Sequence, residues 1–120
     1  MELGTFSIVM RFAIDLETKA LEIYNNKENE EYENIIIQYK KRIKRLNRLI
    51  RENTTEMILE PIDDFKSDPF EFQDDSTDVK VIEDLLASFY NEAAIKIQFM
   101  DEVAEIFEDF VEIHKKNINT

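Results

Sequence analysis

Four long stretches of this chain repeat apolar residues at spacings of three and four, and almost no turn residue interrupts them. That period is typical of an α-helix that buries one face. The chain has only one glycine and two prolines, which is too little punctuation for a fold built from many short strands. We therefore expect an all-α fold, with helices over about residues 5–26, 30–53, 77–97 and 101–117. Expected N-terminal caps are Thr5 or Ser7 for the first helix and Ser76 or Thr77 for the third.

The only long interruption lies between residues 52 and 78 and contains both prolines. It also carries Phe65, Phe70 and Phe72, so we expect it to lie against the helices. A connection of about 25 residues can cross the whole length of a bundle of ~30 Å helices. The other two connections are short. The pattern predicts one domain over residues 1–120: an antiparallel four-helix bundle made of two helical hairpins joined by a long crossover.

Charge and composition exclude several classes of function. The formal net charge is −12, which disfavours binding to nucleic acid or to an anionic membrane through the whole surface. The chain has no cysteine, so disulfides, thiolate catalysis and iron–sulfur ligation are ruled out and a cytoplasmic location is expected. No stretch is apolar enough to span a membrane, and acidic Glu2 argues against a signal peptide. The lone Gly4 excludes glycine-rich phosphate loops.

A glutamate interrupts the apolar stripe of the first expected helix and another interrupts that of the third. Burying an unpaired carboxylate costs several kcal/mol, so both positions need an explanation. In both helices the glutamate stands seven residues before a tyrosine, which suggests a weak internal repeat of the two hairpins. The two stripes are Met10, Ala13, Glu17, Ala20 and Tyr24, and Val79, Glu83, Leu86, Tyr90 and Ala93.

This arrangement resembles the ferritin-like superfamily, and within it the rubrerythrin-like branch. The resemblance rests on the order of the helices and on the two Glu-x6-Tyr signatures, Glu17 to Tyr24 and Glu83 to Tyr90. It implies a di-iron site in the bundle core, with one glutamate from each of helices one and three and a Glu-x-x-His pair from each of helices two and four. Glu17 and Glu83 match the first of these requirements.

The second requirement fails, because no Glu-x-x-His occurs anywhere in the chain and His114 is the only histidine. In the family pattern the glutamate and the histidine stand seven and ten positions after an apolar residue early in the helix. Counted from Phe107 in helix four, these positions hold His114 and Asn117. Counted from Ile36 in helix two, they hold Ile43 and Leu46. A di-iron oxidase or peroxidase would need other carboxylates, such as Glu33, Glu108 or Glu112, to turn inward. We therefore expect a ferritin-like body that has lost its metal centre and its enzymatic activity, with no cofactor.

Two interpretations of Glu17, Glu83 and His114 stay open at the level of sequence. In one, they form a residual site for a single divalent ion such as iron, manganese or zinc. In the other, they form a buried polar cluster in which the glutamates bond to Tyr24, Tyr90 or His114, or in which one of them is protonated. We favour the polar cluster, because carboxylate clusters also occur in cores without any metal.

Residues Lys40 to Arg51 hold seven of the 15 basic residues and no acidic one. One interpretation is a face that binds phosphate or nucleic acid, but the overall charge and the lack of interleaved aromatic residues disfavour it. The other is a solvated helix face that pairs with acidic neighbours in the same bundle or in a partner. Such charge segregation favours a homodimer or another protein partner. The crossover phenylalanines could supply its apolar centre, but we favour the alternative in which they close the side of their own bundle. The expected function is therefore binding or assembly.

Overall fold

The computed structural model describes residues 1–53, 60–72 and 78–119. Within these ranges the chain is helical and contains no strand. Its long helices are α1 (Phe6–Asn26), α2 (Glu33–Glu52), α3 (Val79–Lys96) and α4 (Asp101–Ile118), and its short 3-10 helices are η1 (Glu30–Tyr32) and η3 (Asp68–Phe70). No helix among the described residues is both long and apolar enough to cross a membrane.

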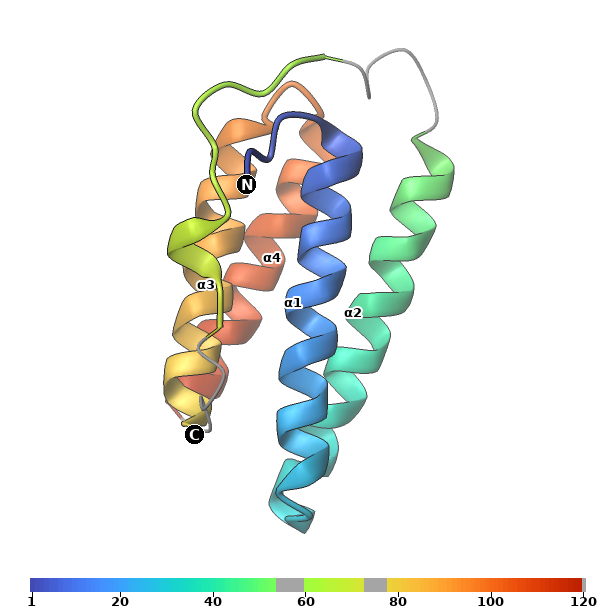
Figure 1. Ribbon diagram of the computed structural model, residues 1–120. Helices are drawn as coiled ribbons and strands as arrows, with labels where there is room; N and C mark the ends of the chain where they lie inside the picture. Colours follow the sequence, from blue (N-terminus) through green and yellow to red (C-terminus); the bar gives the residue numbers. More distant parts are fainter. Residues whose placement is uncertain (54–59, 73–77, 120) are drawn as a thin grey trace.

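The four long helices lie side by side as two hairpins (Figure 1). α1 packs mainly against α2 and α3 mainly against α4, while α1 also touches α3. The colour order in Figure 1 shows α1 and α4 running down the page and α2 and α3 running up it. The described part of the crossover descends along the side of α3 (Figure 1).

Side chains cap the N-termini of α1 and α3, and charged residues suit the dipole of α4. The Thr5 side chain accepts a hydrogen bond from the Ile8 amide and caps α1. At α3 the prediction of Ser76 or Thr77, which lie outside the described residues, is wrong: the cap is Asp78, whose carboxylate accepts from the Lys80 amide at 3.0 Å. Acidic residues open α4 and Lys115 and Lys116 close it, which suits the helix dipole at both ends.

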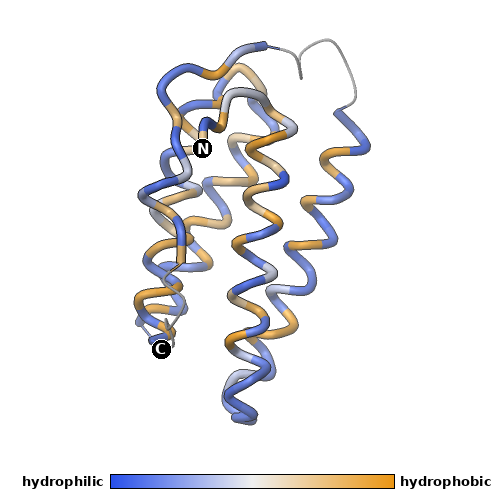
Figure 2. Tube along the Cα trace, viewed as in Figure 1, coloured by the Kyte–Doolittle hydropathy of each residue, from blue (hydrophilic) through white to orange (hydrophobic). Residues whose placement is uncertain are grey.

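The core consists of the inward faces of α1, α3 and α4 together with one face of α2. Both stripes that contain a glutamate turn inward, and every member except half-buried Val79 is buried. Figure 2 shows the apolar residues recurring along each helix at the spacing that the sequence predicted. Phe89 on α3 is a centre of aromatic packing. The centroid of its ring lies 5.4, 5.9 and 5.6 Å from those of Phe12, Phe65 and Phe70.

The crossover joins the core through both its backbone and its phenylalanines. The Leu3 amide donates to the Phe65 carbonyl at 2.7 Å and the Ile62 amide donates to the Gly4 carbonyl at 2.9 Å, which ties the N-terminus to the crossover. Phe65 is only 2% exposed, and Phe70 and Phe72 are half-buried against the core. Phe65 therefore fills the interior of its own bundle, as the favoured interpretation expects, and is too buried to serve as the apolar centre of a dimer interface.

Candidate functional site

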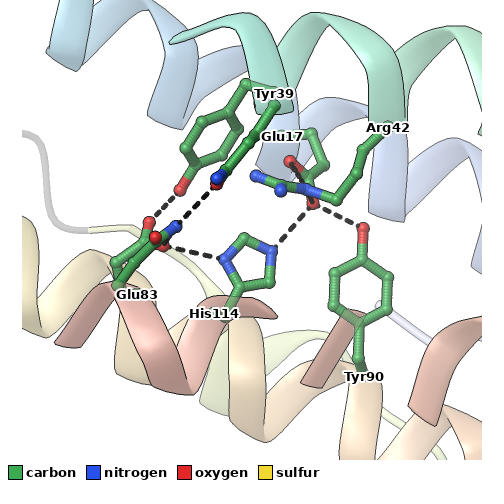
Figure 3. A network of polar contacts seen from close by, with 8 residues as sticks. Glu17, Tyr39, Arg42, Glu83, Tyr90 and His114 are labelled. Carbon is green, nitrogen blue, oxygen red and sulfur yellow. Dashed lines mark hydrogen bonds and ion pairs between the residues drawn. The ribbon is translucent and has the colours of Figure 1, made fainter. Parts of the chain in front are cut away.

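Glu17, Glu83 and His114, the three residues singled out from the sequence, meet in the middle of the bundle (Figure 3). All three are 0% exposed. The imidazole of His114, on α4, lies between the two carboxylates. Its Nδ1 is 3.0 Å from Glu83 Oε1 on α3, and its Nε2 is 3.1 Å from Glu17 Oε1 on α1.

This geometry favours the protonated form of His114. An ionised carboxylate only accepts hydrogen bonds, so a ring that faces two of them fits best as an imidazolium with a proton on each nitrogen. Burial alone would lower the pKa of His114, but the Glu17 charge and the hydrogen bonds to Glu17 and Glu83 outweigh it and raise that pKa above 6.5. One cation is therefore shared between the two glutamates.

Glu17 has a second cationic partner that sequence reasoning missed, Arg42 on α2. The Arg42 Nε lies 3.0 Å from both carboxylate oxygens of Glu17, and its guanidinium carbon lies 4.3 Å from the centre of the Tyr39 ring. The Tyr90 hydroxyl donates to the same carboxylate at 2.8 Å. Burial raises the pKa of Glu17, but the positive charges of His114 and Arg42 outweigh it, and the net shift is downward.

Glu83 has mainly neutral partners besides His114. The Tyr39 hydroxyl donates to Glu83 Oε2 in a short hydrogen bond, and Asn117 Nδ2 donates to Oε1 at 2.7 Å. Burial raises the pKa of Glu83. The hydrogen bond and charge of His114 and the two neutral donors lower it by more, so the net shift of the Glu83 pKa is downward. Burial, and then the Glu83 charge, raise the pKa of Tyr24 and of Tyr39, so both phenols stay protonated.

The network is neutral as a whole, because the charges of Glu17 and Glu83 are balanced by those of Arg42 and His114. All four carboxylate oxygens have at least one donor within hydrogen-bond distance. Buried charges are tolerated when they are paired and hydrogen-bonded in this way. These contacts account for two glutamates in apolar stripes, and the lowered pKa of each favours its ionised form.

Helices α2 and α4 each contribute a pair of side chains three residues apart, Tyr39 and Arg42 from α2 and His114 and Asn117 from α4. Residues three apart share one helix face, so both members of a pair can point into the centre. The α4 pair is the one that the sequence predicted. The α2 prediction was wrong by about one turn: Leu46 is buried in the apolar core and Ile43 is only half-buried.

Arg42 was missed because it belongs to the basic segment Lys40 to Arg51, which was interpreted as one solvated face. The other six basic residues of that segment are indeed exposed, whereas Arg42 is 3% exposed. A signal was available: Arg42 stands three residues after Tyr39 and four before Leu46, in the buried stripe of α2. A cation at that position could have been matched to a carboxylate in a facing stripe.

The arrangement places limits on metal binding. Among the described residues, no group of three or more acidic or histidine side chains is placed to hold a metal ion. The two nitrogens of His114 face different glutamates, and Arg42 sits against Glu17, so an ion at Glu17 would have to displace a cation. The carboxylates that a di-iron enzyme would need to recruit, Glu33, Glu108 and Glu112, are all exposed.

No protein-family model, no curated protein and no solved structure matches this chain. Function must therefore be inferred from the side chains of the network and from their geometry.

Proposed function

We propose that this protein is a ferritin-like bundle of the rubrerythrin-like branch in which an ion-pair network takes the place of the di-iron centre, and that it serves in binding or assembly instead of redox turnover. The observation that carries the proposal is the placement of six inward side chains. A ferritin-like di-iron site takes one glutamate from each of two helices and an i,i+3 pair from each of the other two. The residues with that placement here are Glu17, Glu83, Tyr39 with Arg42, and His114 with Asn117.

The directions of the helices support the same proposal. Two hairpins joined by a crossover that runs the length of the bundle, with the second and third helices parallel, is the ferritin-like connectivity. The repeated Glu-x6-Tyr spacing also gives a pseudo-symmetric arrangement, in which the tyrosine of each helix, α1 or α3, lies near the glutamate of the other. Tyr90 on α3 donates to Glu17 on α1, and Tyr24 on α1 lies close enough to Glu83 on α3 for the carboxylate to raise its pKa.

The chemistry of the network argues for a structural centre. Arg42 and His114 supply two positive charges, the role that two metal ions would otherwise have in balancing buried carboxylates. Every carboxylate oxygen already accepts a hydrogen bond, and the raised pKa values of Tyr39 and Tyr90 keep the phenols protonated. None of these groups is poised to act as a nucleophile or general base.

Restoring the family's ligands tests the ancestry directly. The variant Tyr39→Glu, Arg42→His, His114→Glu, Asn117→His recreates a Glu-x-x-His pair on both α2 and α4. If the six positions correspond to a di-iron site, the purified variant binds two Co²⁺ or Fe²⁺ ions per chain, read by calorimetry and by the visible absorption of Co²⁺. The matched control adds Glu17→Gln and Glu83→Gln and should lose that binding. A helical variant, checked by circular dichroism, that binds no metal would contradict the assignment.

An alternative function is a residual site for one divalent ion at Glu17, Glu83 and His114. It is favoured by one observation: all three side chains are of ligand type, and His114 lies 3.0 Å from Glu83 through Nδ1 and 3.1 Å from Glu17 through Nε2. Calorimetric titration of the unaltered protein with zinc, manganese and ferrous iron distinguishes the two functions. The ion-pair proposal expects a flat trace, and saturable binding that Glu17→Gln and Glu83→Gln abolish would establish the alternative.

The partner for binding or assembly is proposed to be a second copy of the chain in the cytoplasm. Six exposed residues of α2 are basic, whereas the chain as a whole has a formal net charge of −12. Antiparallel pairing of two copies would place the basic face of each against the acidic surface of the other. Light scattering should give twice the chain mass at low salt, and the dimer should weaken as salt screens the charges. A monomer at high protein concentration and low salt would contradict self-association.

A further inference from the structure

A cavity of about 220 Å³ opens at the surface between α2 and α4 and is distinct from the Glu17–Glu83 centre. Three of its lining side chains are cationic, one is an amide and two are apolar. No acidic side chain among the described residues lines it. The lining residues are Gln38, Lys41, Arg42, Arg45, Phe110 and Ile113. In a protein with a net charge of −12, this concentration of cations around one hollow stands out as a local anion-attracting region.

Arg42 connects this cavity to the buried network and has unused hydrogen-bonding capacity. Its Nε is occupied by Glu17, but Nη1 and Nη2 are buried and have no hydrogen-bond partner among the described residues. Buried donors of a charged group are rarely left unpaired, because their desolvation is then uncompensated. Both nitrogens are covered by protein atoms, and Arg42 is itself one of the residues that line the cavity.

We propose that this cavity binds a small carboxylate with a short apolar body, and that Arg42 is its anchor. The terminal nitrogens of an arginine form a planar fork that matches a carboxylate in two parallel hydrogen bonds. Lys41 and Arg45, both exposed at the rim, add attraction for the negative charge. Phe110 and Ile113 form the apolar part of the wall, against which a few carbon atoms can pack.

The size and composition of the cavity favour this ligand over larger anions. Its volume of about 220 Å³ is below the range of roughly 300–1,000 Å³ that holds drug-sized ligands, which favours a ligand smaller than a nucleotide. A bare oxyanion would gain nothing from Phe110 and Ile113. The inference does not depend on the ferritin-like assignment, since it uses only the cavity and the free end of Arg42.

The test is titration of ¹⁵N-labelled protein, followed by NMR, with sodium isobutyrate, with inorganic phosphate and with the neutral amide isobutyramide, all at one ionic strength. Isobutyrate should cause saturable shifts of resonances from residues 38–45 and 110–113. Phosphate should bind more weakly and isobutyramide should cause no saturable shift. Equal binding of phosphate or of isobutyramide, or no saturation with isobutyrate, would overturn the proposal.

Three variants locate the site. Arg42→Lys keeps a cation beside Glu17 but removes the fork, and should weaken isobutyrate binding more than tenfold. Arg45→Gln, on the exposed rim, should weaken it by about two- to fivefold, the worth of an exposed ion pair. Lys44→Gln removes the same charge from α2 outside the cavity and should leave binding unchanged. If Arg42→Lys does not fold, the contrast between Arg45→Gln and Lys44→Gln decides, and equal effects of those two would refute the site.

Discussion

Glu17 and Glu83 occupy matching positions on α1 and α3, yet the protein neutralises them in different ways (Figure 3). Both are fully buried and both share His114. Glu17 also holds Arg42, whose positive charge is permanent at any physiological pH. Glu83 relies on neutral donors besides the histidine, from Tyr39 and Asn117.

This difference divides the network into two halves with different weaknesses. The Glu17 half depends on the Arg42 guanidinium, because without it the buried Glu17 carboxylate would lose its permanent counter-charge. The Glu83 half depends on the proton of His114, so it should respond to pH. The Glu-x6-Tyr motifs of α1 and α3 are therefore similar in sequence but differ in electrostatics, because the facing residues of α2 and α4 give the two glutamates different partners.

The largest effect is expected from Arg42→Met, which preserves much of the side-chain volume but removes the permanent cation. Glu17 is then left with a buried charge that only His114 balances. Breaking a buried ion pair from one side costs about 3–5 kcal/mol, so the free energy of unfolding measured in urea should fall by that amount.

Two matched variants calibrate this measurement. Lys41→Met removes a cation from the exposed face of the same helix and should change stability by less than about 0.5 kcal/mol. The double variant Glu17→Gln with Arg42→Met removes both charges and should recover part of the loss. A cost for Arg42→Met as small as that for Lys41→Met would mean that the ion pair contributes nothing.

A smaller effect is expected from removing single hydroxyls, and it compares the two halves directly. Tyr39→Phe takes a donor from Glu83 and Tyr90→Phe takes one from Glu17. Each should cost about 1.5–3 kcal/mol, the worth of a hydrogen bond to a charged group. We expect Tyr39→Phe to cost more, because Glu83 has no permanent cation to compensate. The reverse order in urea unfolding would contradict the division into two halves.

The smallest of the three effects is the dependence of stability on pH, since each pKa shift is what remains after burial and charge oppose one another. The raised pKa of His114 gives stability that is complete below pH 6.5 and is lost as pH rises through the folded-state value. The lowered pKa values of Glu17 and Glu83 give stability that is complete above pH 4.5 and is lost as pH falls through theirs. The contribution of the network is thus greatest between these limits.

Substitution of His114 separates the alkaline and the acidic parts of the dependence of stability on pH. In His114→Gln the loss of stability on the alkaline side should disappear, because no group of the network titrates there. Urea midpoints measured at several pH values provide the comparison. An alkaline limb that survives in His114→Gln would assign it to another group.

The sequence predicted the four long helices because their apolar residues recur at helical spacing and almost no turn residue interrupts them. Glu17, Glu83 and His114 were placed together for a similar reason: each stands in an apolar stripe where a polar residue has to find a partner. Thr5 as a cap follows from local chemistry in the same way. These are features that one helix, considered alone, already determines.

What the sequence did not predict depends on which faces of different helices meet. The register of α2 against α1 and α3 decides that Tyr39 and Arg42, and not Ile43 and Leu46, face the glutamates. An arginine inside a basic segment looks like surface until its carboxylate partner on another helix is known. The homodimer and the metal alternative stay predictions, since one needs a second copy of the chain and the other a bound ion.

The account depends most on the claim that the bundle centre is a neutral ion-pair network held by a protonated histidine. His114 is the only histidine, so the ¹⁵N and ¹H resonances of its ring can be read without ambiguity. At pH 6.5 the account predicts an imidazolium, with protons on both Nδ1 and Nε2 that exchange slowly with water. A neutral ring with one unprotonated nitrogen at that pH, or a ring whose resonances move when zinc is added, would contradict it.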